Sequence, residues 1–206
     1  KSILIIDKVL LHNTRQEIIR GAELFNIALF KDLANLGYKQ TLLASSSWKI
    51  HLEKLLPKEK ITIKYLPPFR IAWINAVLSF FLMSKGQFDH LLLTNVGDCV
   101  IFPTLMLARN ITKTVIVAHR TASRYFLKAL KSLQPTIVCV NNLISEQFRK
   151  EGFLQVFTDY GIIDADKYFP EEKKEDCLET KFLVFGSLDS EWKGADTAIR
   201  AFLSLQ

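Results

Sequence analysis

Short apolar runs alternate with helix-like stretches along nearly the whole chain, and this rhythm is the strongest constraint on its fold. Most of the runs have the length of a strand and are continuously apolar, which is typical of strands covered on both faces. Parallel strands joined by crossover helices give such an alternation, so we predict an α/β fold with a Rossmann-like, doubly wound parallel sheet. The strand candidates are residues 3–6, 40–44, 61–65, 91–94, 114–117, 137–140, 155–158 and 182–185.

The clearest helix candidate covers residues 22–36. Its large apolar residues are spaced four, four and three positions apart on one stripe, as in a helix that packs one face on a core. These residues are Phe25, Leu29, Leu33 and Leu36. Gly37 follows them as the usual C-terminal stop. Further helix candidates are residues 47–56, 71–84, 100–108, 122–133 and 144–151.

A change of composition near the C-terminus indicates a second domain. The stretch 171–181, EEKKEDCLETK, is charged and holds few residues able to bury, so it resembles a linker. We therefore predict an N-terminal domain at 1–170, a linker at 171–181, and the start of a C-terminal domain at 182–206, with a strand, a tight loop and a helix. A lone strand and helix cannot bury enough surface to be stable alone. Unless they dock onto the first domain, we expect the chain to be part of a longer protein.

Charge and cysteine content narrow the partners. Lys and Arg exceed Asp and Glu by 27 to 21, a net charge of +6 that suits phosphate-bearing ligands or anionic membranes and equally serves solubility. The basic residues are scattered and lack aromatic interleaving, so we predict no nucleic-acid partner. Cys99, Cys139 and Cys177 are widely spaced, which favours neither disulfides nor zinc and predicts a cytoplasmic setting.

The longest apolar segment, residues 71–83, IAWINAVLSFFLM, is too short for the ~20 residues that cross a bilayer. It fits a buried helix against the sheet, or a partly exposed face that meets lipid. Tyr65 and Arg70 precede it, an aromatic and a cation of the kind found at membrane interfaces. The second interpretation predicts peripheral association with the inner face of an anionic membrane.

Open α/β sheets bind ligands where their strands end, so the loops that follow strands are candidate sites. The first such loop, residues 7–20, is a long polar connection. Its last residue is Arg20, and Gly21 and Glu23 follow at the start of the helix. The free N–H groups of a helix start attract anions, and glycine lets a ligand approach the backbone. The chain has neither G-x-G-x-x-G nor a P-loop motif, and a plain turn into a helix accounts for this loop equally well.

A histidine follows the strand candidate 114–117. At that position His119 could carry a proton near neutral pH, and its neighbour Arg120 could meet a phosphate. A structural hydrogen bond is the alternative role for His119. No two histidines have a spacing that suggests a metal ligand pair, so we predict no metal site.

The third loop follows the strand candidate 182–185. Gly186, Lys193 and Gly194 place a flexible loop and a cation just before a helix N-terminus. Such a lysine could stabilise the charge on a departing phosphate group. A solvated loop lysine is the alternative.

Taken together, these stretches resemble the GT-B nucleotide-sugar glycosyltransferases, particularly the retaining family of glycogen synthase-like and bacterial polysaccharide-building enzymes. The resemblance covers nearly the whole chain. Its carriers are residues 21–24, GAEL; 117–119, VAH; 137–145, IVCVNNLIS; 160–164, YGIID, with 169–170, FP; 182–188, FLVFGSL; and 192–202, WKGADTAIRAF.

The resemblance implies a role for each candidate residue. His119 would be the catalytic residue that lines the cleft near the transferred sugar. Donor binding would fall to Gly21, Gly186, Lys193 and Gly194, and the acceptor or phosphate candidates are Arg20, Glu23 and Arg120. No cofactor is implied beyond the nucleotide-diphosphate sugar, which is itself the donor substrate.

Departures from the family pattern fall in the same loops. The family often has Gly-Gly where this chain has Arg20-Gly21, and Gly-Arg where it has Gly186-Ser187. Tyr160 stands where the family has Asn. The family's pair of glutamates, which handles the donor, would lie beyond residue 206.

The resemblance therefore implies an enzyme that transfers a sugar, with retention, from a nucleotide-diphosphate donor to a glycan or lipid-linked acceptor. Such a reaction belongs to polysaccharide or glycoconjugate biosynthesis, and we expect the 206 residues alone to be inactive. Two alternatives stay open. One is a GT-B-fold sugar-nucleotide epimerase, and the other is a non-catalytic module that binds a sugar or phosphate.

Overall fold

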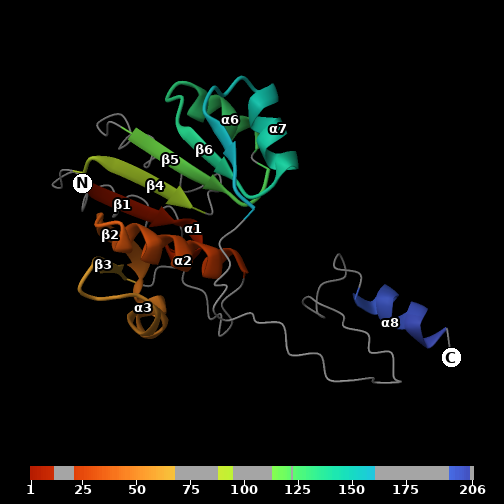
Figure 1. Ribbon diagram of the computed structural model, residues 1–206, viewed down its shortest axis with the longest axis horizontal. Coiled ribbons are helices and arrows are strands. Elements are labelled where there is room, and N and C mark those ends of the chain that lie inside the picture. Colours follow the sequence, from red (N-terminus) through yellow and green to blue (C-terminus); the bar gives the residue numbers. More distant parts are fainter. Residues whose placement is uncertain (12–20, 68–87, 95–112, 122, 161–194, 205–206) are drawn as a thin grey trace. The chain divides into compact units, whose positions relative to one another are not determined.

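The computed structural model describes residues 1–11, 21–67, 88–94, 113–121, 123–160 and 195–204. The chain divides into two compact units, residues 1–164 and 165–206. A seven-stranded parallel sheet forms the first unit, with helices on both faces (Figure 1). The predicted α/β doubly wound fold is confirmed. From the second unit the structure describes helix α8 (Ala195–Leu203), in the place where the sequence predicts a helix.

The seven strands lie in the order β3-β2-β1-β4-β5-β6-β7, and every neighbouring pair is parallel. All seven coincide with apolar runs of the sequence, while the predicted strand at 182–185 lies outside the described residues. The strands are β1 (Ser2–Asp7), β2 (Lys39–Ser45), β3 (Ile61–Leu66), β4 (His90–Thr94), β5 (Lys113–Ala118), β6 (Thr136–Cys139) and β7 (Val156–Thr158).

The strand order reverses at β1. From β1 the chain builds outward through β2 and β3 on one side, and β4 to β7 build outward on the other. The last residues of β1 and β4, Asp7 and Thr94, are partners in the register. In doubly wound sheets ligands bind beside such a reversal, at the side where the strands end. We call that side the carboxyl edge and the opposite side the amino edge.

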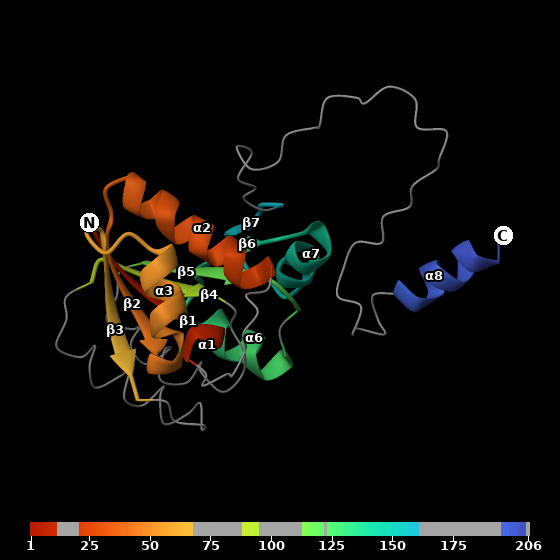
Figure 2. The same ribbon diagram turned by 90° about the horizontal axis from the view of Figure 1, so that it is seen from below.

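The helices of the first unit connect these strands (Figure 2). They are α1 (Lys8–Leu11), α2 (Gly21–Asn35), a 3₁₀ turn η1 (Ser46–Trp48), α3 (Lys49–Leu55), α6 (Arg124–Lys131) and α7 (Asn142–Lys150). The helix candidates at 71–84 and 100–108 lie outside the described residues. Among the helices that are described, none combines the length and the apolar character needed to cross a membrane.

One prediction about the first loop is wrong. The sequence suggests a polar connection from residue 7 onward, whereas residues 8–11 form the short helix α1. Its Leu10 and Leu11 are buried, one in each of the two hydrophobic cores. Burial of these two leucines outweighs the polar character of the rest of the loop.

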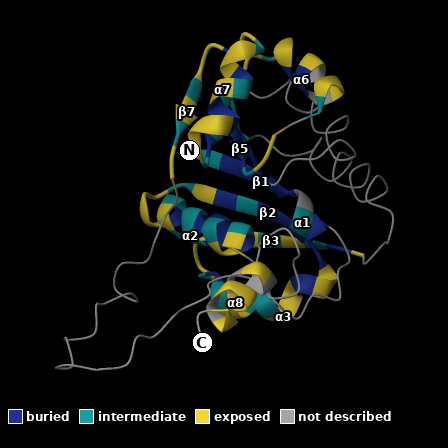
Figure 3. Ribbon diagram, turned by 90° about the vertical axis from the view of Figure 1, so that its right-hand side faces the viewer, coloured by how far each residue is buried: buried dark blue, intermediate teal, exposed yellow. Residues whose placement is uncertain are grey.

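The two cores lie on opposite faces of the sheet because successive residues of a strand point to opposite sides. Ile3 and Ile5 of β1 join the core under α2 and α3, while Leu4 and Ile6 join the other. Figure 3 shows strands β1 and β2 largely buried. Continuous apolar strands thus follow from cover on both faces.

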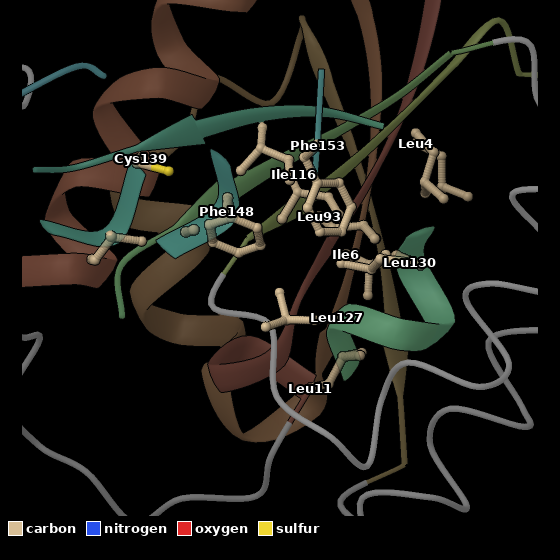
Figure 4. Close-up of a cluster of buried hydrophobic side chains, with 14 of the residues drawn as sticks. Leu4, Ile6, Leu11, Leu93, Ile116, Leu127, Leu130, Cys139, Phe148 and Phe153 are labelled. Atoms are coloured by element: carbon tan, nitrogen blue, oxygen red, sulfur yellow. The ribbon is translucent and has the colours of Figure 1, made fainter. Parts of the chain in front are cut away.

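The core on the second face is completed by α6 and α7. Leu127 and Leu130 of α6 face the strands there, together with Phe148 of α7 (Figure 4). The rings of Phe148 and Phe153 meet edge to face with centroids 5.5 Å apart. Asn141 caps α7, because its side-chain oxygen accepts a hydrogen bond from the Ile144 N–H at 3.0 Å.

Helix α2 packs with a different face from the one its apolar stripe predicts. Its fully buried residues are Glu23, Asn26, Ile27, Phe30 and Ala34. The predicted Phe25, Leu29 and Leu33 are only partly buried at the flank of that face, and Leu36 is 74% exposed. Leu36 lies past the end of the helix, where Gly37 adopts a φ of +83° and ends it as predicted.

Candidate functional site

Asp7 is the centre of a buried polar cluster at the carboxyl edge. It is the last residue of β1 and has no solvent exposure. Its Oδ1 accepts hydrogen bonds from the backbone N–H groups of Val9 at 2.8 Å and Leu10 at 3.1 Å, which open α1. Donors arranged in this way stabilise a carboxylate that burial would otherwise penalise.

The other carboxylate oxygen of Asp7 ties two further elements to β1. Its Oδ2 accepts hydrogen bonds from Thr94 Oγ1, at the end of β4, and from Asn26 Nδ2 on α2, both at 2.7 Å. Thr94 and Asn26 are buried as well. Asp7 therefore joins β1, β4 and α2 at the point where the strand order reverses.

His119 extends the cluster to the next strand. It follows directly after β5, and its Nε2 lies 3.0 Å from Asn26 Oδ1. The ring of Phe25 meets the imidazole at 85° with centroids 5.1 Å apart, which limits rotation of the half-buried side chain. We refer to Asp7, Thr94, Asn26 and His119 as the Asp7 network.

Burial also sets the protonation of His119. It lowers the pKa of the imidazole, because the charged form loses hydration. The neutral ring is therefore the form present near pH 7. Neutral imidazole can donate at one nitrogen and accept at the other, so it can orient a ligand or a neighbouring amide.

Glu23 adds a second acceptor near the network. It lies in the first turn of α2, three residues before Asn26, and only 5% of it is exposed. Residues three apart are neighbours on one helix face. Its Oε2 is buried, and no atom of the described residues forms a hydrogen bond with it. A carboxylate repels phosphate and accepts hydrogen bonds from hydroxyl groups. Of the two roles predicted for Glu23, contact with a hydroxyl group of the acceptor substrate therefore fits its chemistry better than contact with phosphate.

The remaining predicted residues are distributed unevenly. Gly21 is the exposed first residue of α2, and a Cβ atom there would meet nothing within 4 Å, so the described surroundings do not require glycine. Arg120 is exposed and follows His119 at the carboxyl edge. Arg20, Gly186, Lys193 and Gly194 lie outside the described residues.

Sequence reasoning missed Asp7, Thr94 and Asn26. The available signals were a charge that closes an apolar strand, ILIID, and a threonine that closes another, LLLT. Asn26 gives a weaker signal, because an Asn in an amphipathic helix ordinarily faces water.

Two other chemistries find no support in the part of the chain that the structure describes. No group of three or more His, Cys, Asp or Glu side chains there is placed to hold a metal ion. Cys139 is buried in the core, and burial raises the pKa of its thiol to about 11, which suppresses the reactive thiolate.

The fold and the candidate site together define a doubly wound α/β domain with a buried polar network at its carboxyl edge. Neither protein-family models nor curated protein sequences give a match to this chain.

Proposed function

We propose that the chain supplies the N-terminal domain of a GT-B glycosyltransferase. The enzyme transfers a sugar from a nucleotide-diphosphate donor to a glycan or lipid-linked acceptor, with retention of configuration. One observation carries the proposal: His119 is held by Asn26 at the carboxyl edge, after β5, two strands from β1, where the strand order reverses. The family resemblance expects a histidine of the sugar-binding cleft at this position.

The proposed reaction divides the work between two domains. The loop with Gly186, Lys193 and Gly194 binds the donor diphosphate and stabilises the charge that develops as it leaves. The acceptor attacks the donor's own face, and the departing diphosphate helps to remove the acceptor proton. Positioning and charge stabilisation account for the catalysis, so no metal or cofactor enters the scheme.

The described residues fit the acceptor side of this scheme. Neutral His119 can accept hydrogen bonds from sugar hydroxyl groups, and so can Glu23 Oε2, which has no hydrogen-bond partner among the described residues. Arg120 is exposed beside His119 and is available to an anionic group. These contacts orient a polar acceptor for attack.

A thermal-shift panel of nucleotide sugars tests the proposal on protein made from its complete reading frame. We expect one donor to raise the Tm and Lys193→Ala to abolish the rise. Lys128→Ala is the matched control, because Lys128 is an exposed lysine of α6 outside the proposed site. A Tm that no donor changes, or a shift that survives Lys193→Ala, contradicts the proposal.

Product analysis separates the transferase from its two rivals. A transferase forms a glycosylated product only when an acceptor is added. A GT-B-fold epimerase converts the sugar nucleotide without any acceptor. A non-catalytic module binds its sugar or phosphate tightly as the 206-residue chain alone and forms no product.

We also propose that the protein associates peripherally with anionic membranes on the cytoplasmic side. Its net charge is +6, and α6 presents exposed Arg124, Lys128 and Lys131. Flotation with phosphatidylserine-containing vesicles tests this, and we expect salt to weaken the binding. Binding that ignores both salt and lipid charge speaks against the proposal.

A further inference from the structure

At its Asp7 end, the donors and acceptors of the hydrogen bonds in the Asp7 network are fixed. Oδ1 of Asp7 accepts from the backbone N–H groups of Val9 and Leu10, and a backbone N–H can only donate. The hydroxyl of Thr94 donates to Oδ2. All four of the hydrogen bonds described here run toward the Asp7 oxygens, so each of these partners presents a hydrogen to Asp7.

This requirement orients the amide of Asn26. Because Asp7 Oδ2 accepts, the Asn26 group that faces it at 2.7 Å is the NH₂. The amide oxygen then faces Nε2 of His119 at 3.0 Å, and an amide oxygen can only accept. Nε2 therefore carries the proton of the neutral ring, and Nδ1 is left with a lone pair.

We infer that Asp7 and Asn26 are positioning residues that hold His119 in its Nε2–H tautomer, with Nδ1 offered to a hydroxyl group of a sugar ligand. The tautomer follows from the hydrogen bonds alone, whereas the ligand class rests on the proposed function. Asp7 acts on His119 through the amide of Asn26, which contacts both residues.

The chemistry of the neighbouring groups favours a hydroxyl ligand. No described residue forms a hydrogen bond with His119 Nδ1, and Glu23 Oε2 is likewise an acceptor without a partner among those residues. Glu23 precedes Asn26 by three positions on the buried face of α2. Two acceptors suit the O–H groups of a sugar, since phosphate would bring further acceptors.

NMR of the ¹⁵N-labelled 206-residue chain reads the tautomer of each histidine from its ring nitrogen shifts. His119→Gln identifies the signals of His119 among the four histidines. We expect wild type to show a protonated Nε2 and a bare Nδ1. A wild-type His119 protonated at Nδ1 overturns the inference at once.

Asp7→Asn provides the decisive variant, since unconstrained imidazole already favours the Nε2–H form in water. The backbone N–H groups of Val9 and Leu10 keep the Asn oxygen at the Oδ1 position. Its NH₂ then faces Asn26, whose amide must turn its oxygen toward that donor and its NH₂ toward His119. We expect the ring proton to move to Nδ1, and a variant that keeps Nε2–H contradicts the relay.

Asn26→Leu tests the inference independently if Asp7→Asn does not fold. It removes the acceptor of the Nε2 proton and keeps the side-chain size, so that proton should exchange with water roughly tenfold faster. Asn35→Leu is the matched control, because Asn35 is an exposed Asn at the end of the same helix. Equal exchange rates in Asn26→Leu and wild type overturn the inference.

Titration with glucose and with inorganic phosphate tests the ligand class. We expect glucose to shift the Nδ1 signal of His119 and phosphate to leave it unchanged. A response to phosphate, or none to glucose, overturns the hydroxyl assignment. If Asp7→Asn moves the ring proton of His119 but the protein binds no nucleotide sugar, the proposed function is wrong and the positioning of His119 by Asp7 and Asn26 stands. If the protein is a transferase but Asp7→Asn leaves the ring proton on Nε2, the proposed function stands and the positioning role is wrong.

Discussion

An aspartate links each end of β1 to the β4 segment of the chain. Asp7 bonds to the last residue of β4, and Asp89, the residue just before β4, bonds to the first residue of β1. The two contacts lie in different surroundings. At the carboxyl edge, Asp7 accepts from Thr94 in a fully buried position. At the amino edge, Asp89 Oδ2 accepts from the Ser2 N–H at 2.8 Å and from its hydroxyl at 3.1 Å, in contact with solvent. The strands joined are the same, whereas Asp7 is buried and Asp89 is exposed.

The difference indicates which end is specialised. An exposed pair at the amino edge is screened by water and merely aligns the two strands. A buried carboxylate costs desolvation, and apolar residues of similar size would often be at least as stable in its place. Asp7 instead accepts a hydrogen bond from Asn26, whose amide oxygen lies 3.0 Å from His119 Nε2. The carboxyl edge therefore joins two strands at the candidate site.

Asp7→Ala should have the largest effect of any change at the two ends. It leaves the N–H groups of Val9 and Leu10 and the Asn26 amide without their acceptor in a buried position, so we expect a loss of about 3 to 5 kcal/mol in the free energy of unfolding. Urea denaturation followed by circular dichroism measures it. Asp89→Ala is the control, and an equal or larger loss there would break the comparison.

Thr94→Val should have a smaller effect at the same edge. It removes one donor to Asp7 while nearly keeping shape, and the other donors remain, so we expect a loss of about 1 to 2 kcal/mol. The same denaturation measurement applies. Thr62→Val on β3 is the matched control, because Thr62 is exposed, and it should stay within about 0.5 kcal/mol of wild type.

The pH dependence of stability should also distinguish the carboxyl edge. Burial lowers the pKa of His119 in the folded state, so the unfolded chain binds more protons below about pH 6.5. The contribution of His119 is therefore fully present above that pH and is lost as the pH falls toward the lower, folded pKa. We expect His119→Gln to lose less stability than wild type between pH 7.5 and 5.5. A steeper loss in the variant contradicts this sign.

The sequence predicted the strands well because their signal is local. Continuous apolar runs, such as ILII in β1 and LLL in β4, require cover on both faces and hence a parallel sheet. Asp7 and Thr94 are 87 residues apart in the sequence, and they meet because β1 and β4 become neighbours. No local sequence pattern predicts which strands become neighbours. His119 was found because its position after a strand is enough to place it at the carboxyl edge.

Helix α2 shows why the rest of the site was missed. Its apolar stripe drew attention to Phe25, Leu29 and Leu33, whereas the buried face also contains the polar residues Asn26 and Glu23. Burial of Asn26 is favourable only because Asp7 and His119 accept and supply hydrogen bonds there. A polar residue can thus lie on the buried face of a helix when its partners come from strands distant in sequence.

The smallest expected effect is the acid response of the amino edge. The hydrogen bond from the Ser2 N–H, followed by that from its hydroxyl, lowers the pKa of the exposed Asp89. Its contribution to stability is therefore present above the unfolded pKa of about 3.9 and is lost as the pH falls through the lower, folded pKa. Asp89→Asn should leave stability at pH 7.5 to 5.5 parallel to wild type and flatten the decline only below about pH 4. If Asp89→Asn instead altered the window assigned to His119, the two ends of β1 would be coupled, and the division between an aligning amino edge and a functional carboxyl edge would not hold.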